Sequence, residues 1–115
     1  MNAKQFLILG ASVLASSLCG LAHAEDIQGT YVRLAKIEID PALLESYRAA
    51  AKEEIEASVR MEPGVLALYA VSEKDNPGHV LVFEIYADEA AYRKHLDTPH
   101  FKKYKAATGK MVKSL

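Results

Sequence analysis

The chain alternates between hydrophobic and polar residues from residue 30 to residue 39, where it reads TYVRLAKIEI. Successive side chains of a strand point to opposite faces, so this alternation predicts a strand with at least one apolar face. Asp40 and Pro41 follow, and a capping residue before a proline is a typical helix start. Hydrophobic residues then recur at steps of three and four, which predicts an amphipathic helix over residues 41–60.

Two further strands are predicted in the middle of the chain. Pro63 and Gly64 end the helix, because proline cannot continue it and glycine accommodates the turn. Residues 65–73 (VLALYAVSE) and 79–87 (HVLVFEIYA) have the composition of strands. The segment between them, residues 74–78 (KDNPG), consists of turn formers and suits a hairpin.

Two short helices and a strand complete the predicted order. Asp88 caps a helix that runs through Leu96, and Thr98-Pro99 repeats the cap-plus-proline pattern for a second helix. Residues 111–115 form a possible final strand stub. The order strand, helix, strand, strand, helix, strand predicts an α+β, ferredoxin-like split βαβ fold, with an antiparallel sheet and helices on one face. The other face carries apolar residues, so we expect a second copy of the chain to cover it in a homodimer.

The first 24 residues have the pattern of a cleaved secretory signal peptide. Lys4 precedes an uncharged apolar run of about sixteen residues, which is shorter than the ~20 that a membrane-spanning helix needs. Ala22-His23-Ala24 matches the small-x-small rule for cleavage. We therefore expect a single domain over residues 25–115, periplasmic or secreted, with no membrane span after cleavage. The one cysteine, Cys19, would leave with the leader, so the domain would have neither a disulfide nor a thiol nucleophile.

Charge and motifs exclude several classes of function. The chain has 14 basic and 15 acidic residues among 115, a balance that does not indicate nucleic-acid binding. It contains no glycine-rich phosphate loop, no Gly-x-Ser-x-Gly motif, no His-Glu-x-x-His and no cysteine pair. These absences weigh against a nucleotide site, a Rossmann flavin site, a serine hydrolase and a structural zinc site.

The candidate chemistry is carried by residues 84–101 (EIYADEAAYRKHLDTPHF). An imidazole in general titrates near neutrality, so His95 is a candidate for acid–base or substrate-orienting work, although a histidine hydrogen-bonded to the backbone is an equal alternative. His100 lies in the first turn of its helix and is either a second proton-handling group or a packing residue. Two imidazoles five residues apart across a helix break are not a recognised metal spacing, so we expect no metal.

Two side chains of the third strand share one face, Glu84 and Tyr86. A carboxylate on a largely apolar face needs a partner, so Glu84 either serves a substrate pocket or forms a salt bridge, for example to Arg33. Tyr86 and Tyr69 are candidates for an aromatic pocket, and ordinary packing is the alternative for both.

Several of these segments resemble one known family, the antibiotic biosynthesis monooxygenase domain, and especially its small quinol-monooxygenase-like members. The resemblance rests on EPGVL at 62–66, FEIY at 83–86, DEAAY at 88–92, His95, and TPHF at 98–101, and it extends over nearly all of residues 30–115.

The resemblance implies a ferredoxin-like fold that dimerises through its sheets in an α/β-barrel-type association. It also implies monooxygenation, by O₂, of a small aromatic or quinol substrate, without metal, flavin or other cofactor. His95 and His100 would then handle protons or orient the substrate, with Tyr86, Glu84 and Tyr69 at the pocket. The family ends with a full last strand, so we expect a truncated one in a chain that stops at Leu115. A non-catalytic dimeric module that binds a small hydrophobic ligand and a haem-degrading relative remain alternatives, because fold does not fix the reaction.

Overall fold

The structure is a computed structural model, and it describes residues 29–115. The predicted leader, residues 1–24, lies outside the described residues. Within the described part of the chain, no helix is both long and apolar enough to cross a membrane.

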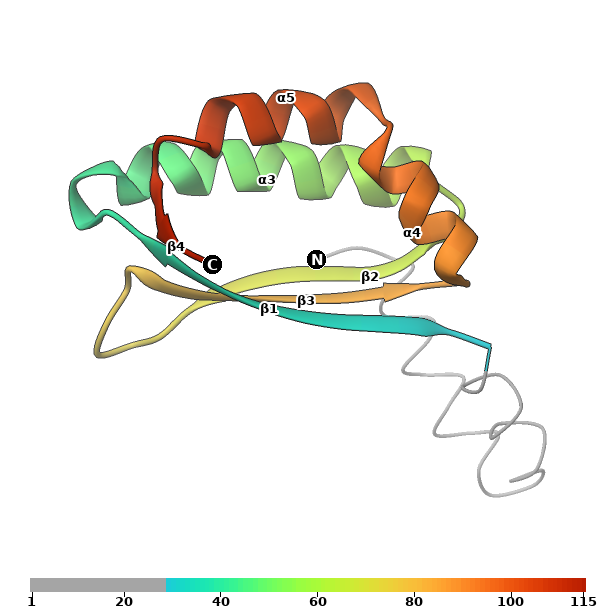
Figure 1. Ribbon diagram of the computed structural model, residues 1–115, viewed down its shortest axis with the longest axis horizontal. Coiled ribbons are helices and arrows are strands. Elements are labelled where there is room, and N and C mark those ends of the chain that lie inside the picture. The colour runs from blue at the N-terminus through green and yellow to red at the C-terminus, as the bar shows by residue number, and fades with distance from the viewer. Residues whose placement is uncertain (1–28) are drawn as a thin grey trace, which may run out of the picture.

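The described residues form four strands and three α-helices, the first of which is preceded by a 3₁₀ turn (Figure 1). In chain order they are β1 (Tyr31–Ile39), η1 (Pro41–Leu43), α3 (Leu44–Met61), β2 (Val65–Ser72), β3 (His79–Tyr86), α4 (Glu89–Leu96), α5 (Pro99–Thr108) and β4 (Val112–Ser114).

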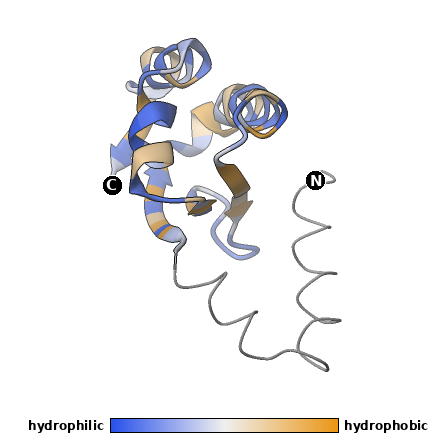
Figure 2. Ribbon diagram, turned by 90° about the vertical axis from the view of Figure 1, so that its right-hand side faces the viewer, coloured by the Kyte–Doolittle hydropathy of each residue, from blue (hydrophilic) through white to orange (hydrophobic). Residues whose placement is uncertain are grey.

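The strands make one antiparallel sheet in the order β2-β3-β1-β4, and the helices lie together on one face of it (Figures 1 and 2). This arrangement confirms the predicted ferredoxin-like α+β fold. The predicted helix over 41–60 differs mainly at its start, because the three residues after Asp40 form the 3₁₀ turn η1, and it runs one residue further, to Met61. The final strand is the three-residue β4, which pairs with β1 at Glu38 and Ile39.

Side-chain caps set the helix starts, as their sequence signals indicated. Asp40 accepts a hydrogen bond from the backbone N–H of Ala42 at 3.0 Å, and Asp88 accepts one from Ala91 at 2.7 Å. Thr98 does the same for the backbone N–H of the third residue of α5. The Thr98-Pro99 step separates α4 from α5 and so lets the two helices take different directions over the sheet (Figure 1).

Two clusters of buried residues hold the helices against the sheet. One joins β1, α3 and β3 through Ile37, Ile39, Tyr47, Ala51 and Val80. The other joins the C-terminal half of α3 to β2 and β3 through Val59, Val65, Leu68 and Tyr86. The two clusters lie toward opposite ends of α3, and the candidate site lies between them.

The outer face of the sheet remains apolar and uncovered within one chain. Val32, Leu34, Val71 and Phe83 are exposed hydrophobic residues. On β1 they alternate with inward-facing residues, and Leu34 lies directly opposite Phe83 across the β1–β3 ladder.

Gly64 allows α4 to approach the start of β2 closely. A Cβ added at Gly64 would lie 2.6 Å from the Cβ of Ala91, which is well inside van der Waals contact. We therefore expect Gly64→Ala to lower the free energy of unfolding by about 1–3 kcal/mol, the usual cost of overpacking. Gly29→Ala is the matched control, since a Cβ there meets no atom within 4 Å. Equal urea denaturation midpoints for the two variants would contradict this close packing.

Three of the six tyrosines, Tyr47, Tyr86 and Tyr104, should ionise late. Burial raises the pKa of each above 10.0, and for Tyr86 the hydrogen bond to Glu84 raises it further. The folded chain then keeps protons that the unfolded chain releases above about pH 10, so stability should fall as pH rises beyond that point. Ultraviolet titration should show an incomplete tyrosinate signal until the protein unfolds. Ionisation of all six tyrosines in the folded protein near pH 10 would refute the assignment.

Candidate active site

A cavity of about 390 Å³ lies between the sheet and the helices. Its walls are mainly apolar. Polar side chains reach it from every layer of the fold, among them Arg33 on β1, Glu54 on α3, Glu84 on β3, and Tyr92 and His95 on α4. Mainly apolar walls with a few converging polar groups are typical of a small-molecule site.

His95 lies in the last turn of α4 and is 2% exposed. Its ring packs against aromatic neighbours on both sides, with centroid distances of 4.9 Å to Phe101 and 5.5 Å to Tyr86. This packing fixes the plane of the imidazole. Its orientation is therefore set before any ligand enters.

Two carboxylates hold the two ring nitrogens of His95. Nδ1 is 2.9 Å from Oε2 of Glu62, and Nε2 is 3.2 Å from Oε1 of Glu54. Glu54 is itself held by Ser58, whose hydroxyl donates a hydrogen bond to Oε1 at 2.8 Å. A buried imidazole with a carboxylate at each nitrogen is not the backbone-bonded histidine that the sequence left as an alternative.

His100 extends this arrangement toward the surface. Its Nε2 lies 2.6 Å from the same oxygen of Glu62 that contacts His95, and both His100 and Glu62 are slightly exposed. Glu54, His95, Glu62 and His100 thus form a continuous series of contacts, here called the histidine–carboxylate network: an ion-pair contact joins Glu54 to His95, and hydrogen bonds join Glu62 to both histidines. It leads from the wall of the cavity to the edge of the helical layer.

The first carboxylate of the network has the properties of a base. Burial raises the pKa of Glu54 above its usual value, while the hydrogen bond from Ser58 and the nearby charge of His95 oppose that rise. A carboxyl group that holds its proton more tightly than usual is a better proton acceptor at neutral pH than an exposed glutamate.

A second polar group supports the opposite wall of the cavity. Tyr86 donates a hydrogen bond to Oε1 of Glu84 at 2.5 Å, and Arg33 lies 3.6 Å from the other oxygen. Arg33 also donates a hydrogen bond to the hydroxyl of Tyr92 at 2.7 Å and lies over its ring. The Glu84–Arg33 salt bridge raised from the sequence is therefore present, and its two members line the cavity.

The structure brings four of the five candidate residues to this region. His95 and Glu84 line the cavity, Tyr86 is buried against both of them, and His100 joins through Glu62. Tyr69 is placed elsewhere, because it lies opposite Phe83 in the β2–β3 ladder and so faces the outer side of the sheet. Tyr69 and Tyr86 therefore face opposite sides of the sheet, because Phe83 and Tyr86 are three residues apart on β3 and successive side chains alternate between faces.

Sequence reasoning missed Glu54 and Glu62. Glu54 lies on the buried stripe of α3, three residues after Ala51 and four before Ser58, so its position on the apolar stripe was the available signal. Glu62 is the C-cap residue of α3. Its contact with two histidines more than thirty residues away depends on the packing of three helices and has no local signal.

Glu62, His95 and His100 form the one group in residues 29–115 whose ligand atoms lie close enough together, within 4.8 Å, to hold a metal ion. Two imidazoles and a carboxylate are a known donor set for divalent transition metals. Here, however, their separations of 2.6 and 2.9 Å are those of direct hydrogen bonds. We interpret the group as proton-sharing, and the absence of a metal requirement stays a prediction.

Comparison with known proteins supports one family. Residues 30–107 match the model of the family described as antibiotic biosynthesis monooxygenase. No curated protein gives a match to the chain.

Solved structures agree with the family match. A proposed antibiotic biosynthesis monooxygenase from Bacteroides thetaiotaomicron is 61% identical, has a TM-score of 0.74, and is matched over 76% of this chain and 83% of its own. A proposed monooxygenase from Lactobacillus acidophilus is 37% identical, with a TM-score of 0.74, over 75% of this chain and 41% of its own. A proposed antibiotic biosynthesis monooxygenase from Caulobacter crescentus is 26% identical and has a TM-score of 0.72. It is matched over 81% of this chain and 90% of its own. The chain therefore belongs to the antibiotic biosynthesis monooxygenase family.

Proposed function

We propose that this protein is a cofactor-independent monooxygenase that uses O₂ to hydroxylate a small aromatic or quinol substrate. Membership of the family and the similarity to proposed monooxygenases support oxygen chemistry in general. The single observation that carries the finer proposal is the Glu54–His95 pair, which places a buried base at the wall of a mainly apolar cavity.

The chemistry requires little from the protein beyond proton transfer and shelter. Glu54, held by Ser58 and His95, accepts the proton of a phenolic hydroxyl, and the resulting electron-rich anion reduces O₂. One oxygen atom enters the ring and the other leaves as water, so a quinol and O₂ give a hydroxyquinone and H₂O. All four electrons come from the substrate. The apolar walls keep bulk water from the reactive intermediate.

The other members of the histidine–carboxylate network carry the proton away. His95 passes it to Glu62, and His100 delivers it to the surface. On the far wall, Arg33 offers positive charge near the substrate anion, although Glu84 partly neutralises it.

We further propose that the protein acts in the periplasm as a homodimer. The proposed location rests on the leader-like residues 1–24. The dimer rests on the uncovered apolar face of the sheet, which a second copy would bury.

Oxygen uptake with a panel of reduced quinones tests the reaction. We expect His95→Gln and Glu54→Gln to lower kcat/KM by about 10²–10⁴-fold, the usual contribution of a general acid–base group. Because the raised pKa of Glu54 sets when the base is free, the rate should increase with pH through that pKa in the wild type, and Glu54→Gln should abolish this dependence. His79→Ala is the control, since His79 is half-exposed at the hairpin and contacts Glu38 and Glu73 instead.

Two outcomes would reject the reaction. Unchanged turnover in a folded His95→Gln variant would remove the proposed role of the network. Tight binding of quinones without oxygen uptake would favour the non-catalytic binding module, and a Soret band on adding haem, lost with a reductant, would favour haem degradation.

Sedimentation analysis tests the dimer. We expect Leu34→Asp to give a monomer, because a carboxylate cannot be buried without a partner at the centre of an apolar interface. Met61→Asp is a matched control, since Met61 is 62% exposed and Leu34 is 61% exposed, but Met61 lies at the end of α3. A Leu34→Asp variant that remains dimeric would place the interface elsewhere.

A further inference from the structure

We propose that the substrate carries an anionic group and that Arg48 recognises it at the open edge of the helix–sheet gap. This inference rests on the proposed function and extends it, because it names the substrate class as a hydroxylated aromatic acid. The starting observation is a second cavity, which the histidine–carboxylate network does not touch.

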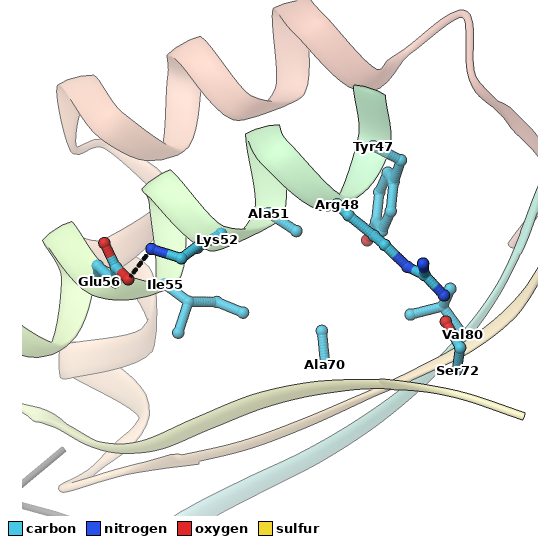
Figure 3. A pocket seen from close by; sticks show the side chains of 9 residues that line it. All are labelled: Tyr47, Arg48, Ala51, Lys52, Ile55, Glu56, Ala70, Ser72 and Val80. Atoms are coloured by element: carbon cyan, nitrogen blue, oxygen red, sulfur yellow. Dashed lines mark hydrogen bonds and ion pairs between the residues drawn. The ribbon is translucent and has the colours of Figure 1, made fainter. Parts of the chain in front are cut away.

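The second cavity has a volume of about 640 Å³ and lies between α3 and the strands β2 and β3 (Figure 3). β2 is an edge strand of the sheet, so this cavity lies at a side of the fold rather than at its centre. Its apolar surface comes mainly from Ala51, Ile55, Ala70 and Val80. Figure 3 shows these side chains directed into the space between helix and strands.

The two cavities share four lining residues: Tyr47, Ala51, Ile55 and Ala70. They are therefore adjacent parts of the same helix–sheet gap. Ala51 on α3 and Ala70 on β2 contribute only methyl groups where larger side chains would close that gap. A flat apolar molecule entering at the β2 edge can thus extend toward Glu54 and His95.

One cation is directed over the outer cavity. The side chain of Arg48 extends from α3 toward the strands and ends near Ser72 and Val80 (Figure 3). Its guanidinium contacts Glu45 at 2.9 Å, but that carboxylate is almost fully exposed and lies outside the cavity lining. An exposed pair of this kind is weak, so Arg48 can exchange Glu45 for a ligand carboxylate at little cost. Lys52, in contrast, is turned aside toward Glu56 (Figure 3).

The spacing along α3 defines the size of the ligand. Arg48 and Glu54 are six residues apart on one helix, which corresponds to about 9 Å along its axis. Two fused rings with an acidic group at one end and the reacting hydroxyl at the other have a length comparable to this rise along the axis. A guanidinium binds a carboxylate through two parallel hydrogen bonds, which gives the outer end its selectivity.

A binding assay with two probes of one shape tests this recognition without turnover. 6-Hydroxy-2-naphthoate has a carboxylate opposite its hydroxyl, and 6-hydroxy-2-naphthamide replaces the carboxylate with a neutral amide. We expect the wild-type chain to bind the acid at least about 10-fold more tightly than the amide, as a charge-assisted hydrogen bond would give. The preference should decrease as salt is added, because Arg48 is half-exposed.

Variants assign the preference to one residue. Arg48→Gln should abolish it and leave the affinity for the amide unchanged. Arg93→Gln is the matched control, because Arg93 also pairs with a glutamate of its own helix but lies on α4 outside both cavities. Ala70→Phe should weaken the binding of both probes, because the larger side chain fills the gap. Thermal melting verifies that this variant is folded.

The outcomes separate this inference from the proposed reaction. Equal affinity for acid and amide in the wild type, or a preference retained in Arg48→Gln, would overturn the role of Arg48 even if neutral quinols are oxidised. A preference for the acid that is lost in Arg48→Gln would support the role of Arg48. It would do so even if no quinol is oxidised, because the absence of oxidation counts only against the proposed reaction.

Discussion

The position of the helices depends on how one buried imidazole is satisfied. His95 is removed from water and must find partners for both ring nitrogens within the protein, because an unpaired polar group is costly to bury. It finds them on α3 and at the C-cap of α3, and the same cap carboxylate reaches α5. His95 and the Glu62 carboxylate together therefore join α3, α4 and α5. The absence of a side chain at Gly64 lets Ala91, on the same helix as His95, lie close to the start of β2.

The same fold leaves part of its interior unfilled. The two buried clusters pack the gap toward either end of α3, but the first of them includes Ala51 and packs against Ala70, whose small side chains leave the adjoining space open. A larger side chain there would bury more apolar surface and would be expected to increase stability. The unfilled gap leaves room for a ligand and lowers the stability that closer packing would give, as is common in binding sites.

The sequence predicted the fold well because its signals are local. Alternation in β1, the aspartate and threonine caps and the prolines at the helix starts each act within a few residues, and each appears as expected. The site was predicted less well. His95, Glu84 and Tyr86 lie at or against the cavity, whereas Tyr69 faces the other side of the sheet, because the register of β2 on β3 puts it opposite Phe83. The contacts of Glu62 depend on tertiary packing, which no periodicity reveals.

The histidine–carboxylate network has two ends, Glu54 at the helix–sheet cavity and His100 at the start of α5. Both residues also line a hollow of about 40 Å³ between α3 and α5, which lies outside the helix–sheet cavity. A ligand that enters beside β2 would seal the cavity without covering His100. Protons would then leave by a route different from the one by which the substrate enters. The interior could return to its starting protonation state while product is still bound, so proton release need not wait for the cavity to empty.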